Sequence, residues 1–120
     1  MVKRWTDRLA GTQLVYETNA RDSDYSGGST YYERRIVIKL GANKIFTLDD
    51  QSLMRISIRI ETRARPSRTK KVGFWRIAVS TRDQPLLVLK PSDEDEILYV
   101  ISVRDKTLHL DGKPWALTRP

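Results

Sequence analysis

The sequence predicts one all-β domain spanning residues 1–120, folded as an antiparallel up-and-down barrel of about eight to nine strands. Three observations predict this class. Apolar and polar side chains alternate in the longest apolar runs, short polar turns separate the runs, and no stretch of ten or more residues has the 3.6-residue period of an amphipathic helix. A sandwich of two packed sheets is the alternative.

Two runs show the alternation most clearly, and each places its large apolar side chains on one face. In residues 31–40 this face carries Tyr32, Arg34, Ile36, Ile38 and Leu40. In residues 53–61 it carries Met54, Ile56, Ile58 and Ile60. Both runs therefore predict strands with one buried face.

The remaining candidate strands are residues 12–19, 44–48, 72–80, 85–89, 96–103, 107–110 and 113–117. The separators offer Gly, Asn or Asp for turns, at residues 41–43, 49–50, 82–84, 104–106 and 111–112. Links this short favour antiparallel neighbours, because a parallel crossover needs about a dozen residues or more. A meander of about eight strands tends to close on itself, since closure removes the exposed edges.

Three segments depart from the meander. Residues 20–30 are predicted to form a long polar loop, and residues 62–71 a basic tip between two long strands. Each is either a tolerated loop or a functional lid, because ordinary hairpins need only about two to five loop residues. Residues 5–9 are the one stretch expected to form a helical turn.

The composition excludes several classes of chemistry. The chain has no Cys, which excludes disulfides, thiolate metal sites and Cys nucleophiles. It has neither a signal-peptide pattern nor an apolar run long enough to span a membrane, so we expect a cytoplasmic protein. Its 22 Lys and Arg against 15 Asp and Glu give a net charge of +7, which suggests nucleic acid, an anionic membrane or an acidic protein as the partner.

Several short pieces occur in an ordered series over most of the chain: residues 9–12 (Leu-Ala-Gly-Thr), 73–77 (Gly-Phe-Trp-Arg-Ile), 85–89 and 108–115. In this order and spacing the chain resembles the lipocalin-like, or calycin, barrels, especially the short bacterial ones. Gln13 stands where lipocalins usually have Trp. The resemblance implies a meander barrel with an open mouth near the first long loop; it is compatible with an apolar pocket and implies no reaction.

Candidate residues for lining such a pocket are Arg34, Tyr32, Ile36, Met54, Ile58, Trp75 and Tyr99. Arg34 is notable because the alternation places it with Ile36, and a buried guanidinium needs an anion or several acceptors. A ligand carboxylate would satisfy it. The alternatives are an Asp or Glu at the barrel end, or extension of the side chain into water. If the large side chains instead fill the barrel, we expect binding through its surface.

Residues 55–76 form the second candidate site. The residues expected to bind nucleic acid or another anion are Arg63, Arg65, Arg68, Lys70 and Lys71. If the flanking strands pair, many of these charges are expected to gather on one exposed face, with Phe74 placed for base stacking. The alternative interpretation is that they only prevent the strand edge from pairing with other chains.

The sequence offers no catalytic equipment. His109 is the only histidine, and nucleophile, Walker and dinucleotide-binding motifs are missing, so we expect no catalytic residue, metal site or cofactor. Trp5, Trp75 and Trp115 are more consistent with core packing than with a ligand cage. The leading hypothesis is a non-enzymatic module that holds a small apolar or amphipathic ligand or contacts a protein partner. Binding of nucleic acid through residues 55–76 is the alternative.

Overall fold

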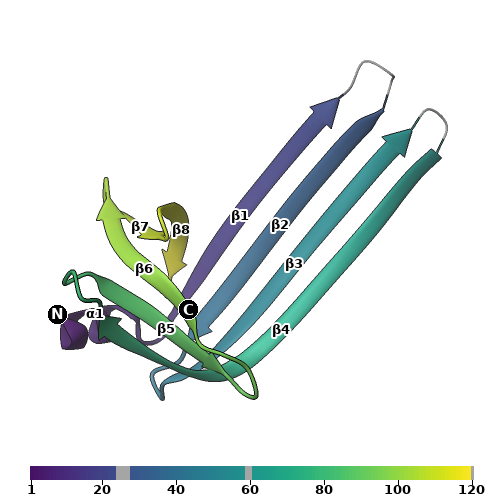
Figure 1. Ribbon diagram of the computed structural model, residues 1–120. Helices are drawn as coiled ribbons and strands as arrows, with labels where there is room; N and C mark the ends of the chain where they lie inside the picture. The colour runs from purple at the N-terminus through teal and green to yellow at the C-terminus, as the bar shows by residue number, and fades with distance from the viewer. Residues whose placement is uncertain (24–27, 59–60, 120) are drawn as a thin grey trace.

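The computed structural model describes residues 1–23, 28–58 and 61–119, which form an all-β, closed, antiparallel barrel (Figure 1). The eight strands follow one another around it in chain order, and β1 pairs with β8 to close it, as predicted for an up-and-down barrel. The elements are α1 (Val2–Leu9), β1 (Thr12–Ser23), β2 (Ser29–Leu40), β3 (Ile45–Ile58), β4 (Glu61–Val79), β5 (Pro85–Pro91), β6 (Ile97–Arg104), β7 (Thr107–Leu110) and β8 (Lys113–Thr118).

The strands differ greatly in length. β1 to β4 have 12, 12, 14 and 19 residues, whereas β5 to β8 have 7, 8, 4 and 6. The short strands enclose only one half of the long ones. The other half projects from the barrel as a four-stranded sheet (Figure 1). We call this sheet, residues 16–23, 29–36, 49–58 and 61–72, the arm.

The barrel interior is filled by side chains from α1 and from every strand. Trp75, Phe46, Leu14 and Ile38 are among those with almost no exposed surface. Trp75 also donates its indole N–H to the carbonyl of Gly41 at 2.9 Å, so its one polar group is satisfied. The predicted core positions of Trp75 and Trp115 are confirmed.

The barrel end away from the arm is covered by α1 (Figure 1). This helix is longer than the single turn expected at residues 5–9, and its Leu9 is fully buried in the core. Thr12 caps the junction by donating its hydroxyl to the carbonyl of Leu9 at 2.6 Å. No helix in the described part of the chain has the length and apolar character needed to cross a lipid bilayer.

The predicted turn at Asp49 and Asp50 is wrong, because β3 runs through both residues without a break. Asp is unfavourable in strands, but alternation sends these two side chains to opposite faces, where each meets an arginine. Asp49 accepts hydrogen bonds from Arg68, and Asp50 accepts them from Arg34. Residues 45–48 and 53–58 of the two predicted strands therefore belong to one strand, β3, whereas Glu61 begins β4.

The two predicted loops are also mostly strand. Residues 62–71 belong to β4, and of residues 20–30 the structure assigns 20–23 to β1 and 29–30 to β2. Residues 24–27 lie outside the described part. Pro66 fits within β4 because this part of β4 pairs only with β3, so the missing N–H faces the open edge. In the described residues, strand thus replaces most of each expected loop.

The apolar face predicted for residues 53–61 is not buried. Met54 and Ile56 are 40% and 37% exposed, since they lie in the arm, where no second layer covers them. The side chains of Ile58 and Ile60 lie outside the described residues. By contrast, the turn predictions at residues 41–43, 82–84, 104–106 and 111–112 are confirmed, with positive φ angles at or beside these sites, as at Asp83 (59°) and Asp105 (52°).

Replacing Gly73 with alanine is expected to lower the free energy of unfolding by about 2 to 4 kcal/mol. An added Cβ would overlap the carbonyl oxygen of Lys90 on the neighbouring β5 strand, so β4 and β5 would have to separate. Urea denaturation followed by tryptophan fluorescence would measure the loss. Gly112→Ala is the control, because its Cβ meets nothing within 4 Å and it costs only the strain of a positive φ, about 1 kcal/mol. Equal losses in the two variants would contradict this account.

Candidate functional site

The predicted pocket residues lie in two separate places. Tyr32, Arg34 and Ile36 share one face of β2, and Met54 lies opposite Tyr32 on β3, so these four are neighbours on the face of the arm that continues the barrel interior. We call it the inner face. Tyr99 on β6 borders it, because the charges of Arg34 and Asp50 both act on the Tyr99 hydroxyl. Trp75 lies apart from them, in the core beside the Gly41 turn.

Arg34 lies at the boundary between barrel and arm and is held by Asp50. Its Nε and Nη2 donate to the two carboxylate oxygens at 3.1 and 2.7 Å. This bidentate contact raises the pKa of Arg34. The guanidinium thus has an acidic partner within the chain, as the alternative interpretation of Arg34 proposed. Asp50 was missed as a site residue because the sequence pattern assigned it to a turn.

An aromatic cluster of Tyr16, Tyr99 and Trp115 packs at the edge of the core. The Trp115 ring lies 5.3 Å from Tyr16 and 6.0 Å from Tyr99, centroid to centroid. Burial is the main cause that raises the pKa of Tyr99, and the charge of Asp111 adds to it. Tyr16 was not among the predicted site residues, although its alternation with Leu14 on β1 was a signal that could have placed it on this face.

The opposite, outer face of the arm carries a continuous trough. Three clefts of about 730, 580 and 560 Å³ share lining residues: Glu33 and Leu53 line the first and second, and Arg35 lines the first and third. We call the combined feature the outer trough. Alternation places on this face the lining cations Arg21, Arg35, Lys39, Arg55, Arg68 and Lys70 and the lining acids Glu17, Glu33 and Asp49.

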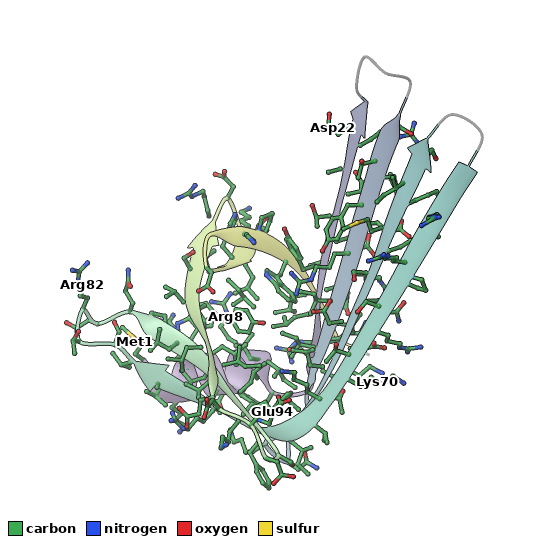
Figure 2. The ribbon with its side chains drawn as sticks, turned by 45° about the vertical axis from the view of Figure 1, so that its right-hand side comes forward. Met1, Arg8, Asp22, Lys70, Arg82 and Glu94 are labelled. Atoms are coloured by element: carbon green, nitrogen blue, oxygen red, sulfur yellow. The ribbon has the colours of Figure 1, made fainter. Side chains whose placement is uncertain are left out.

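The five predicted anion-binding residues do not share one face, because they fall on alternate positions of β4. Arg63 and Arg65 lie opposite Ile56 and Met54 on the inner face. Arg68 and Lys70 lie on the outer face, and Figure 2 shows the Lys70 side chain pointing away from the barrel. Lys71 pairs with Glu94 at 2.8 Å. The sequence predicted that many of the charges of residues 55–76 gather on one exposed face. Arg68 and Lys70 do so beside Arg55 of β3, whereas the strand period places Arg63 and Arg65 on the other face.

The acids of the outer trough are paired within the chain. Glu17 accepts from Arg35 at 2.9 Å, and Asp49 accepts from Arg68 at 3.1 and 2.8 Å. Glu33 accepts a hydrogen bond from the Tyr31 hydroxyl at 2.8 Å, which raises the pKa of Tyr31. With these acids paired and cations in excess, the trough is positively charged.

Comparison of the chain with models of protein families, with curated proteins and with solved structures found no match. Among the described residues, no three His, Cys, Asp or Glu side chains lie close enough together to hold a metal ion. The inner face and the outer trough of the arm, with the aromatic cluster beside them, are the candidate binding surfaces.

Lowering the pH is expected to reduce the free energy of unfolding of the wild-type protein more than that of its Asp49→Asn variant. The hydrogen bond from Arg68 holds the pKa of Asp49 below its ordinary value of 3.8. The carboxylate therefore stabilises the fold fully above that value, and this contribution disappears as the pH falls through the lower folded-state pKa. Urea midpoints measured from about pH 4 to about pH 2.5 should fall more steeply for the wild type. Asp95→Asn, in an exposed turn, is the control and should follow the wild type; identical curves for all three proteins would refute the role of Asp49.

Proposed function

We propose that this chain is a non-enzymatic binding module that recognises a protein partner through the inner face of its arm. The observation that carries the proposal is the contrast between the two halves of β1 to β4. One half surrounds an interior occupied by the chain's own side chains, whereas the other is a sheet with uncovered apolar and cationic residues. We place the chain among the lipocalin-like barrels, with its binding surface moved from the interior to the arm.

The packing of the barrel supports a surface rather than an interior ligand site. Fifteen buried apolar residues form one cluster inside it. Tyr16 and Tyr99 pack against this cluster, with their rings tilted and edge-on to Trp115. Arg34, which a ligand carboxylate would otherwise have to neutralise, is already bound to Asp50. A small apolar ligand would have to displace several of these contacts.

The inner face has the composition of a protein-binding surface. Tyr32, Met54 and Arg65 lie in one row across β2, β3 and β4, and the exposed Ile56 lies in the next row. Tyr, Met and Arg are the residue types enriched at protein interfaces, where they supply apolar contact area together with directed hydrogen bonds. The positive charge beside the apolar residues favours a partner with an acidic rim around an apolar centre.

Nucleic-acid binding by residues 55–76 is the second candidate, and the outer trough favours it. The trough joins Arg55, Arg68 and Lys70 into one cationic surface, and Phe74 nearby on β4 is 66% exposed. Aromatic and cationic side chains together can bind single strands by stacking and phosphate contacts. The acids Glu17, Glu33 and Asp49 within the trough oppose phosphate, which is why we favour the protein partner.

The test compares proteins retained from host extract by three forms of the full chain: wild type, the inner-face variant Met54→Asp with Arg65→Glu, and the outer-face control Arg55→Glu with Lys70→Glu. We expect one acidic protein to be retained by the wild type and the control but lost with the inner-face variant. Calorimetry with that purified protein should show affinity at least about tenfold weaker for the inner-face variant, as for loss of a central interface residue.

Two results would overturn the proposal. The first is salt-dependent binding of an oligonucleotide, in fluorescence anisotropy, that is lost with the outer-face control and kept by the inner-face variant. The second is a small molecule released on unfolding, detected by comparing native and denaturing mass spectra of the purified chain.

A further inference from the structure

The arm has two open edges, and they differ in how well they resist pairing with another chain. β1 pairs with β8 only at residues 13–15, so residues 16–23 pair with β2 alone. β4 pairs with β5 only from Gly73 onward, and the carbonyl of Val72 accepts from the Ser92 N–H at 3.0 Å, so residues 61–71 pair with β3 alone. The β4 edge carries Pro66 and a dense series of cations, the usual protections of a strand edge. The β1 edge has neither a proline nor a lysine.

The hydrogen-bond ladder shows which groups this β1 edge offers. Gly41 N–H donates to the carbonyl of Ile45 at 2.8 Å, so odd-numbered residues of β2 bond toward β3. Their antiparallel partners on β1 are also odd-numbered, as in the pair of Asn19 with Glu33. Because the two bonding directions alternate along a strand, the N–H and C=O of Glu17, Asn19 and Arg21 point to the open edge.

These residues form a self-complementary pattern. Glu17 and Arg21 lie on the same face of β1 at equal distances in sequence from Asn19. When a second copy pairs antiparallel about a twofold axis at Asn19, Glu17 lies opposite Arg21 of that copy, and Arg21 lies opposite its Glu17. The small Thr18 and Ala20 meet on the other face. Arg35 donates to Oε1 of Glu17. The other carboxylate oxygen, Oε2, can therefore accept a hydrogen bond from the guanidinium of Arg21 of the second copy.

We propose that this chain forms a homodimer by antiparallel pairing of the β1 edges, centred on Asn19. The two four-stranded arms then make one eight-stranded sheet, in which the protected β4 edges lie at the two ends. Pairing through β4 is disfavoured, because Pro66 lacks one edge donor and two β4 strands would bring Arg65, Arg68 and Lys70 of both copies together. The dimer does not depend on the proposed function, since edge pairing leaves both faces of each arm uncovered.

The experiment is sedimentation equilibrium of the full chain over a range of micromolar concentrations. We expect a monomer–dimer equilibrium in the wild type. Glu17→Arg should weaken it at least about tenfold by placing two cations opposite each other, and Arg21→Glu should do the same with two acids. Combining both changes exchanges the charges and should restore the dimer to within about threefold of the wild type. Arg65→Glu on β4 is the control and should leave the equilibrium unchanged.

A backbone variant tests the pairing independently of charge. Asn19→Pro removes the central edge N–H, and the β1–β2 ladder keeps its bonds because that N–H faces outward, as at Pro66 of β4. Circular dichroism should match the wild type while the dimer is lost. A wild-type chain that stays monomeric throughout, or a dimer that is unchanged in Glu17→Arg and Asn19→Pro, would overturn the proposal, and so would a dimer lost in Arg65→Glu alone.

Discussion

Packing inside the barrel is the interaction on which the rest of the structure depends. Leu14, Ile38, Phe46 and Trp75 from the four long strands meet Leu87, Leu89, Ile101 and Leu110 from the short ones. Burial of this apolar area is the main favourable term available to a chain without disulfides. Strands β5 to β8 are too short to extend the core further. The remaining halves of β1 to β4 therefore continue beyond it as a single-layer sheet. The arm is therefore supported by its own ladder and cross-strand contacts.

Charged residues lie where the buried core ends and the arm begins. Along β2, Ile38 and Ile36 are buried and the next residue on that face is Arg34; along β3, Leu48 is followed by Asp50. The bidentate pair between Arg34 and Asp50 lets both strands leave the buried core for the exposed inner face of the arm without leaving either of these two charges unpaired. On the outer face, Arg35 with Glu17 and Arg68 with Asp49 join neighbouring strands of the arm in the same way.

The sequence predicted the fold class because alternation and turn chemistry are local properties. The face shared by Tyr32, Arg34 and Ile36 follows from a period of two, and Asp111 with Gly112 is a turn from its residues alone. Alternation does not report whether a second layer covers a face, so Met54 and Ile56 were expected in the core and lie in the arm. Nor does it report register, which pairs Arg34 with Asp50 and brings Tyr16 to Trp115 from the far end of the chain.

The closure of the barrel has a consequence for how the chain reaches its native state. β1 to β4 form through hairpins whose partners are close in sequence, whereas the seam between β1 and β8 joins residues 13–15 to residues 116–118. Loop-closure entropy makes that distant pairing costly, and hairpin contacts form ahead of it. The hairpins of β5 to β8 are also local in sequence, and those of β6 to β8 are the most local of the described strands. Both halves of the barrel therefore form from hairpins, and the core is completed only when the last strand docks beside the first.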